Sequence, residues 1–339
     1  SFVVDLMKDV SVAELRSLGA PTAQAVLPAV EWTSCPGFCG RTVLNATTVL
    51  LSECGACEWG MRVRHNMFCQ PCDDSLSDYD WLYLLFVFLL PLLLYVFQVH
   101  AYYPSSNNRW SEWLEAASCV VECSLAGLGS VMVFSPRGSF HLKSCGSSSL
   151  KNWYPWMYNP VIEYAKTMPC TYEMVYPLHT LPFVYLLFCL VNTAILRGIL
   201  YASVLRKQRR PRALYAALFS LPCLAVANAF FAGLFYFSFP FVTAMYSVGM
   251  QGVQLSLARP RSLVSLLVKF RGRSGGGNGR QIVFLLMHSL LLAFSIIALA
   301  VRAGRMSVGL SFLAAVPVPP LFFIATMHFS HPAATHLAS

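Results

Sequence analysis

The chain has 339 residues, of which 56% are hydrophobic and only 12% are charged, and its formal net charge is +9. Ordinary soluble domains contain about 25% charged residues, so this composition is too apolar for a soluble domain and excludes most classes of soluble enzyme. Seven apolar stretches long enough to cross a bilayer follow residue 80. The lipid bilayer is therefore the expected environment, and no nucleic-acid partner is indicated.

The first 33 residues are expected to form a poorly ordered extension with no assigned role. They contain Asp5, Asp9 and Glu14 and lack a compact apolar core beside a basic start, so they do not have the pattern of a secretory signal peptide. We expect the first apolar stretch to act as a reverse signal-anchor that carries the acidic N-terminus across the membrane.

Residues 34–78 form a small cysteine-rich head. Two Cys-x-x-Cys pairs, Cys54 with Cys57 and Cys69 with Cys72, also have a spacing that suits tetrahedral zinc. In an oxidising lumen, six cysteines so close together are typical of disulfides. The head is therefore predicted to be disulfide-rich, with zinc or redox-active Cys-x-x-Cys chemistry as alternatives. Its disulfide candidates are Cys35, Cys39, Cys54, Cys57, Cys69 and Cys72.

Residues 79–329 are predicted to form an all-α transmembrane bundle of seven helices. A spanning helix needs roughly 20 mostly apolar residues. The second span is the least regular because Glu115 and Glu122 interrupt it. The fourth span is expected to end near Pro240, because a proline disrupts the helix that precedes it. The expected spans are 81–100, 116–134, 178–196, 214–234, 240–258, 281–301 and 310–328.

The uneven distribution of charge predicts the orientation. Residues 174–339 contain fourteen Lys and Arg and no Asp or Glu, and most of these bases fall in the loops 197–213 and 259–280, which follow odd-numbered spans. The positive-inside rule places that side in the cytosol. The head, with its glycosylation sequon at Asn45, is then luminal and the tail 330–339 cytosolic.

The basic residues of the predicted cytosolic loop 197–213 have two possible roles. We expect them to set the topology and to contact anionic lipid. The alternative is a kinase docking motif, in which basic residues precede spaced leucines. These residues are Arg206, Lys207, Arg209, Arg210 and Arg212.

The loop 135–177 returns to the luminal side. It contains Cys145 and Cys170, which are predicted to form a fourth disulfide with each other. Its many tyrosines and tryptophans are typical of a membrane interface, with a re-entrant or partner-binding loop as the alternative.

Glu122 is the one carboxylate predicted to lie well within a span, and intramembrane carboxylates are functional candidates by default. We expect it to make a structural polar contact with Asn192, Asn228 or a backbone group, while a transport or proton role is the alternative. The chain has no His-Glu-x-x-His motif, and its Ser, His and acidic residues never cluster on adjacent spans. No catalytic residue, cofactor or metal is predicted.

Several short motifs occur in a specific order along residues 35–329. The sequence around them resembles the JNK-associated membrane protein family. The motifs are Ser52-Glu-Cys-Gly-Ala-Cys57, Cys69-Gln-Pro-Cys72, Tyr79-Asp-Trp-Leu-Tyr83, Glu122-Cys-Ser124, Tyr158-Asn-Pro160, Val175-Tyr-Pro-Leu178 and Tyr215-Ala-Ala-Leu218.

This resemblance implies a non-enzymatic protein of the endoplasmic reticulum membrane that takes part in clearing misfolded proteins. Its expected partners are proteasome regulatory subunits and membrane ubiquitin ligases, together with JNK in stress signalling. The alternative from another class is a seven-span receptor or small-solute transporter with a luminal sensing head.

Overall fold

The computed structural model divides into two compact units, one of residues up to Asp74 with Lys143–Pro177 and one of Ser75–Leu142 with the residues from Leu178 onward. The predicted N-terminal extension, most of the loop 259–280 and nearly all of the tail lie outside the described part of the chain. The structure describes residues 34–45, 50–64, 68–102, 109–134, 137–147, 149–158, 170, 175–205, 212–258 and 278–330.

The first unit is built from short strands that have little apolar core of their own. Strand β1 (Val43–Asn45) pairs with β2 (Leu50–Leu51), and β3 (Met61–Arg64) pairs antiparallel with β4 (Phe68–Pro71). The remaining elements are β5 (Asp74–Ser75), β6 (Lys143–Ser144), α5 (Leu150–Trp153) and α6 (Pro155–Tyr158). Cysteines make up much of what is buried here, as expected for a domain too small to be stabilised by a hydrophobic core alone.

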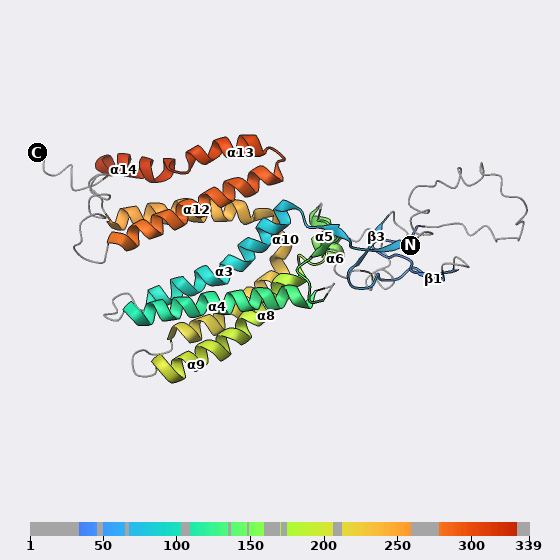
Figure 1. Cartoon of the computed structure of the whole chain (residues 1–339). Helices are drawn as coiled ribbons and strands as arrows, with labels where there is room; N and C mark the ends of the chain where they lie inside the picture. The colour runs from blue at the N-terminus through green and yellow to red at the C-terminus, as the bar shows by residue number, and fades with distance from the viewer. Residues whose placement is uncertain are drawn as a thin grey trace, which may run out of the picture. The chain divides into compact units, whose positions relative to one another are not determined.

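The second unit is a helical bundle (Figure 1), which agrees with the prediction of an all-α membrane protein. Helix α8 (Thr180–Asn192) continues through η2 (Thr193–Arg197), α9 (Gly198–Leu200) and η3 (Tyr201–Leu205). The last apolar segment is broken into α13 (Met306–Phe312), η4 (Leu313–Ala315) and α14 (Val318–Ser330). The long helices are α3 (Asp78–Tyr102), α4 (Arg109–Val133), α10 (Arg212–Ala258) and α12 (Asn278–Arg302).

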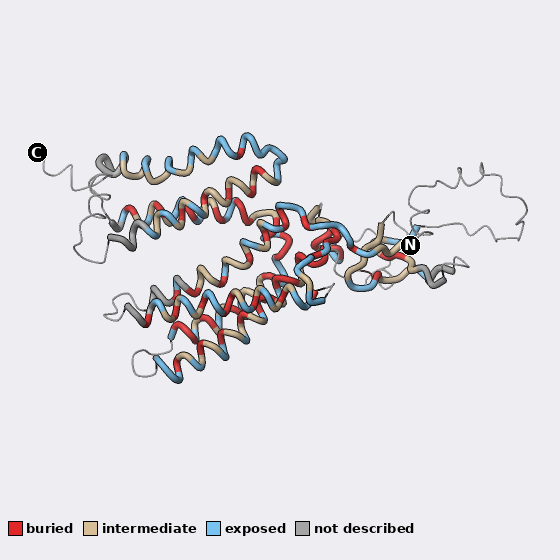
Figure 2. The backbone as a smooth tube through the Cα atoms, viewed as in Figure 1, coloured by how far each residue is buried: buried red, intermediate tan, exposed pale blue. Residues whose placement is uncertain are grey.

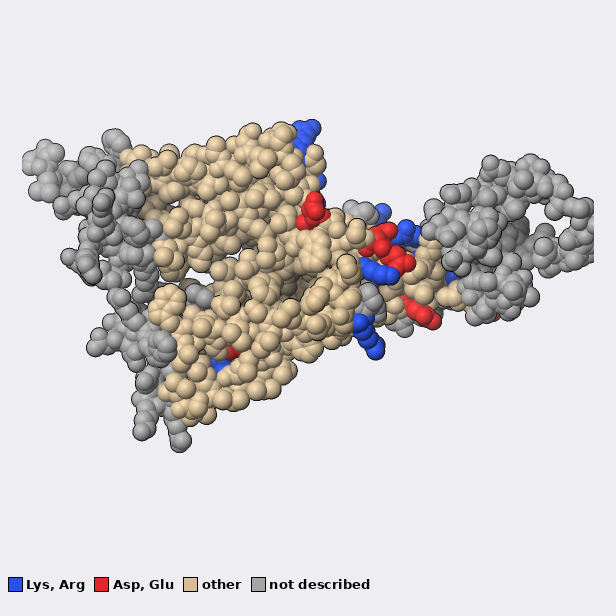
Figure 3. Space-filling model, viewed as in Figure 1, with Lys and Arg blue, Asp and Glu red and all other residues tan. Residues whose placement is uncertain are grey.

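Buried residues lie along the facing sides of the packed helices, whereas α13 and α14 are largely exposed (Figure 2). Only 6% of the residues in the segment Met306–Thr326 are buried, against 28–33% in the other long apolar helices. The face of this unit in Figure 3 is almost free of Lys, Arg, Asp and Glu along the helices. Such a surface suits hydrocarbon, because a charged side chain is costly there.

The structure differs from the prediction in the number of separate helices. Six helices within the described residues are long and apolar enough to cross a membrane, rather than seven. The predicted fourth and fifth spans both lie in α10, a continuous helix of 47 residues that contains Pro222 and Pro240. At 1.5 Å per residue, a straight helix of this length would measure about 70 Å, more than twice the roughly 30 Å hydrocarbon core.

Contacts with α3 show that the first part of α10 runs antiparallel to it. Near the end of α3, Gln98 donates from Nε2 to Ser220 Oγ (3.2 Å). Near the start of α3, the Tyr236 hydroxyl donates to Asp80 Oδ1 (2.7 Å). Asp80 and Gln98 are about 27 Å apart along a regular helix, so α10 traverses most of the length of α3 between Ser220 and Tyr236.

The second part of α10 then returns in the opposite direction. At one end of α12, Arg302 contacts the Phe237 carbonyl of α10 and the Tyr79 hydroxyl near the start of α3. Ser247 of α10 instead donates to the carbonyl of His288, fourteen residues or about 21 Å earlier on α12. The helix must therefore bend between these contacts. Figure 1 agrees, since α10 passes beside α8 in its first part and beside α12 in its second.

Pro240 gives the physical reason for the bend. A proline has no N–H, so it cannot donate to the carbonyl four residues earlier, that of Tyr236. The Tyr79 hydroxyl donates to this carbonyl instead (2.8 Å), and Arg302 Nη1 donates to the neighbouring Phe237 carbonyl (2.9 Å). Side chains from α3 and α12 thus occupy backbone acceptors at a kink.

Candidate functional site

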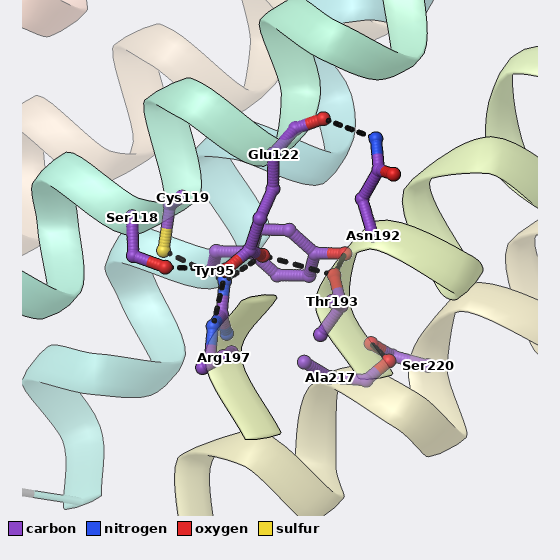
Figure 4. Close-up of polar contacts among 9 residues, drawn as sticks. All are labelled: Tyr95, Ser118, Cys119, Glu122, Asn192, Thr193, Arg197, Ala217 and Ser220. Atoms are coloured by element: carbon purple, nitrogen blue, oxygen red, sulfur yellow. Dashed lines mark hydrogen bonds and ion pairs between the residues drawn. The ribbon is translucent and has the colours of Figure 1, made fainter. Parts of the chain in front are cut away.

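A buried ion pair connects α4 with the segment that follows α8 in the helical unit (Figure 4). Glu122 is fully buried and Arg197 is 1% exposed. The guanidinium binds the carboxylate through two hydrogen bonds, from Nη2 to Oε2 (2.6 Å) and from Nε to Oε1 (3.1 Å). A two-point contact of this kind is short and directional.

Neighbouring side chains complete the coordination of the Glu122 carboxylate. Thr193 Oγ1 donates to Oε2 (3.0 Å) and Ser118 Oγ donates to Oε1 (2.5 Å). The Tyr95 hydroxyl lies 2.9 Å from Thr193 Oγ1, and the Tyr95 ring lies under the Arg197 guanidinium, 4.5 Å from ring centroid to Cζ. Both carboxylate oxygens are therefore hydrogen-bonded, which offsets part of the cost of taking the carboxylate out of water.

Helical spacing explains how these side chains come together. Ser118 and Glu122 are four residues apart on α4, and Thr193 and Arg197 are four residues apart in η2. Residues at this separation lie on the same face of a helix. The two faces meet in one of the larger helix–helix contacts of the bundle, that between α4 and α8 with its η2 continuation. η2 is a π-helix, a form often found at functional sites.

The predicted partner of Glu122 was wrong. Asn192 donates to the backbone carbonyl of Glu122 (3.1 Å), not to its carboxylate, and Asn228 donates to the His179 carbonyl (3.4 Å). The partner is Arg197, the first residue of the predicted cytosolic loop 197–213. The helical segment continues to Leu205, so Arg197 lies inside the span and not in a loop.

Glu115, the other acid that interrupts the predicted second span, makes a further buried polar contact on α4. Its side chain is 1% exposed, and Oε1 accepts a hydrogen bond from the Tyr201 hydroxyl (2.7 Å). Glu115 and Glu122 are seven residues apart, so they share one face of α4. Both carboxylates of this face thus contact the segment after α8.

In the first unit, the eight cysteines proposed as disulfide candidates form four disulfides. The predicted bond between Cys145 and Cys170 is wrong, because each of these residues bonds to a cysteine of the head. The four bonds are Cys35–Cys54, Cys39–Cys170, Cys57–Cys69 and Cys72–Cys145.

The two bonds that leave the head join it to the segment from Lys143 to Pro177, with sequence separations of 131 and 73 residues. The four cysteines of the zinc alternative, Cys54, Cys57, Cys69 and Cys72, belong to three different disulfides. Within the described residues, no three His, Cys, Asp or Glu side chains gather as a metal site.

Non-covalent contacts support the same connection. Arg62 Nη1 donates to the carbonyls of Cys145 (3.2 Å) and Gly146 (2.8 Å). Burial lowers the pKa of the Arg62 guanidinium, and the nearby charge of Arg64 lowers it further. The rings of Trp59 and Tyr176 meet edge to face at 4.8 Å between centroids. The head and the predicted loop 135–177 therefore fold largely as one unit.

The remaining predicted sites are only partly described. Asn45 is the last residue of β1, directly before residues 46–49, which lie outside the described residues. Arg212 begins α10 and is exposed. The other predicted basic residues of that loop, Arg206, Lys207, Arg209 and Arg210, lie outside the described residues.

Known proteins match nearly the whole chain. The family described as JNK1/MAPK8-associated membrane protein matches residues 35–332. A Caenorhabditis elegans protein named JNK1/MAPK8-associated membrane protein homolog is 36% identical over 315 residues, which cover 89% of this chain and 95% of the relative. The Homo sapiens and Mus musculus proteins named JNK1/MAPK8-associated membrane protein are 36% and 35% identical over 300 residues, covering 87% of this chain and 93% of each relative.

No solved structure matches the chain significantly. The matched range includes all four disulfides and the Glu122–Arg197 pair. The resemblance first noted in the sequence motifs is confirmed, and the chain belongs to the JNK1/MAPK8-associated membrane protein family.

Proposed function

We propose that this protein is a non-enzymatic adaptor of the endoplasmic reticulum membrane that recruits proteasomes and membrane ubiquitin ligases for the degradation of misfolded proteins. Relatives are named for association with JNK1/MAPK8, and we include JNK among the proposed partners. The adaptor role itself follows from the family resemblance of the sequence motifs.

The observation that favours an adaptor over a transporter is the environment of Glu122. A carboxylate that carries protons or solute must exchange its partners during each cycle. Here, Arg197, Thr193 and Ser118 bind both oxygens, and the pair is closed off from solvent. Such a site holds helices together, as expected for a protein that acts through its surfaces.

The proposed topology has seven passes, a luminal N-terminus and a cytosolic C-terminus. The bend of α10 at Pro240 supports the seven passes, because each half of that helix runs the length of a neighbouring helix in an opposite direction. Four disulfides in the first unit support a luminal position, since such bonds persist in oxidising compartments. Residues 174–339 contain fourteen bases and no acids, and most of these bases fall in the loops 197–213 and 259–280. In the seven-pass topology these loops lie on the same side as the C-terminus, so the positive-inside rule supports a cytosolic C-terminus.

Affinity capture tests the adaptor proposal. The full chain, tagged and extracted from reticulum membranes in mild detergent, is captured with and without folding stress, beside an unrelated seven-span control. We expect proteasome regulatory subunits and membrane ubiquitin ligases to be enriched over the control, and more so under stress. If the protein is intact and abundant but neither class is enriched, the adaptor proposal is wrong and the receptor or transporter alternative takes its place.

Asn45 provides a test of the proposed orientation. If the head is luminal, Asn45 in the Asn45-Ala46-Thr47 sequon is expected to be glycosylated. Treatment with an N-glycosidase then shifts the mobility of the expressed protein, and Asn45→Gln removes the shift. A matched Asn107→Gln change, outside any sequon, leaves it in place. If glycosidase treatment does not change the mobility of the chain that retains Asn45, the luminal placement is contradicted.

A further inference from the structure

The helical unit also contains a cavity that has no role in the proposed adaptor function. This cavity of about 480 Å³ lies between α3, the second part of α10 and α12. Its volume is within the range of roughly 300–1,000 Å³ typical of small-molecule sites. Its walls include Phe86 and Phe97 of α3, Thr243 and Met250 of α10, and Phe294 of α12.

Thr243 is the unusual residue of this wall. It is 6% exposed, and its hydroxyl has no hydrogen-bond partner among the described residues. Hydroxyl side chains in helices commonly bond the carbonyl four residues earlier, as Ser295 does to Leu291 (2.8 Å) and Thr326 to Phe322 (2.9 Å). In hydrocarbon, where no water replaces the missing partner, an unpaired buried hydroxyl indicates a polar group that is supplied from elsewhere.

The dimensions and charge of the cavity restrict what can supply that group. Phe86 and Phe97 are eleven residues apart on α3, so the cavity extends about 16 Å along the helix. Thr243 lies less than one helical turn after the bend at Pro240, so its hydroxyl is close to one end of the second part of α10. The polar group of the occupant must therefore also lie near that end. The described residues that line the cavity include no charged side chain.

The cavity also opens toward the apolar exterior of the bundle. Val242 and Tyr246 line it and are 54% and 49% exposed. An occupant therefore enters from the hydrocarbon phase. Spread over about 16 Å, a volume of about 480 Å³ leaves a mean cross-section of roughly 30 Å². This is too small for a partner's transmembrane helix, which is about 10 Å across with its side chains. A phospholipid would bring a charged head group, and none of the described lining residues is basic.

We propose that this cavity binds a sterol, an elongated uncharged lipid with a single hydroxyl group. The sterol hydroxyl exchanges a hydrogen bond with Thr243 Oγ1, and the fused rings and tail lie along α3 between the aromatic side chains of Phe86, Phe97 and Phe294. This site is independent of the adaptor function and of the Glu122–Arg197 pair.

Photolabelling of the purified full chain in sterol-free detergent micelles tests the proposal. A sterol with a diazirine on its ring system and an alkyne on its tail is expected to label peptides of α3, α10 or α12 that line the cavity, and unlabelled sterol competes. Thr243→Val is expected to weaken binding about tenfold, the effect of one hydrogen bond of roughly 1.4 kcal/mol. Thr243→Ser, which keeps the hydroxyl, is expected to restore it.

Two further variants separate binding from folding. Met250→Trp is expected to fill the cavity and abolish labelling. Thr326→Val removes a hydroxyl that already bonds the carbonyl of Phe322, and it is expected to leave labelling unchanged. All variants are compared at equal recovery of monodisperse protein. Any one of three results overturns the sterol proposal. These are labelling outside the cavity, sterol binding by Thr243→Val equal to that of the unsubstituted chain, and preferential labelling of the cavity by a photoreactive phosphatidylcholine.

Discussion

Replacing Glu122 with leucine is expected to destabilise the helical unit by about 3–5 kcal/mol, because it leaves the buried charge of Arg197 without a carboxylate. The cost follows from burial, since Arg197 is 1% exposed and lies within the span Thr180–Val204. The measurement is equilibrium unfolding of the purified protein in mixed detergent micelles. Arg197→Met alone is expected to have a similar effect, since it leaves the carboxylate unpaired.

The double variant Glu122→Leu/Arg197→Met distinguishes an ion pair from simple loss of packing. Two apolar side chains of similar size can replace a buried pair at little net cost, so the double variant is expected to recover most of the stability lost in either single one. Val121→Ala on the same helix, at a residue 51% exposed, is the control and is expected to change stability by less than about 0.5 kcal/mol. Single variants as stable as this control contradict a structural role for the pair.

Cutting the chain between α3 and α4 is expected to leave its two parts covalently joined. A protease site inserted within residues 103–108 separates the head from the segment from Lys143 to Pro177 in sequence, but Cys39–Cys170 and Cys72–Cys145 still connect them. On a non-reducing gel the cut protein is expected to migrate as one species, and reduction releases two fragments.

Cysteine variants decide which bonds are responsible. The variant Cys39→Ser/Cys170→Ser is expected to remain joined after cutting, because Cys72–Cys145 is intact, although it loses up to about 4 kcal/mol of stability in the loop-entropy model. Removing both bonds is expected to separate the fragments without reduction. Cys57→Ser/Cys69→Ser, which opens a bond within the head, is the control and stays joined. Separation of the unmodified cut chain contradicts the pairing described here.

Composition and local pattern were sufficient for the membrane class, the approximate helix positions and the identity of the disulfide-forming cysteines. Hydrophobicity over about 20 residues is a local property, since each spanning helix satisfies its own backbone hydrogen bonds. The position of Glu122 in a span could also be predicted this way. Local pattern predicted a helix end near Pro240, whereas the helical backbone continues through this proline and only the direction of α10 changes there.

Only the tertiary structure decided which cysteines bond to each other and which side chain binds Glu122. Eight cysteines allow 105 pairings, and the actual pairing depends on contacts between segments far apart in sequence, such as that of Arg62 in β3 with the Cys145 carbonyl. Arg197 could not be distinguished in the sequence from the bases that follow it in the predicted loop 197–213, because its burial depends on a helix that extends to Leu205 and on α4 packing against it. Sequence pattern therefore determined which residues enter the membrane and which form disulfides, while contacts between distant segments determined what each of them binds.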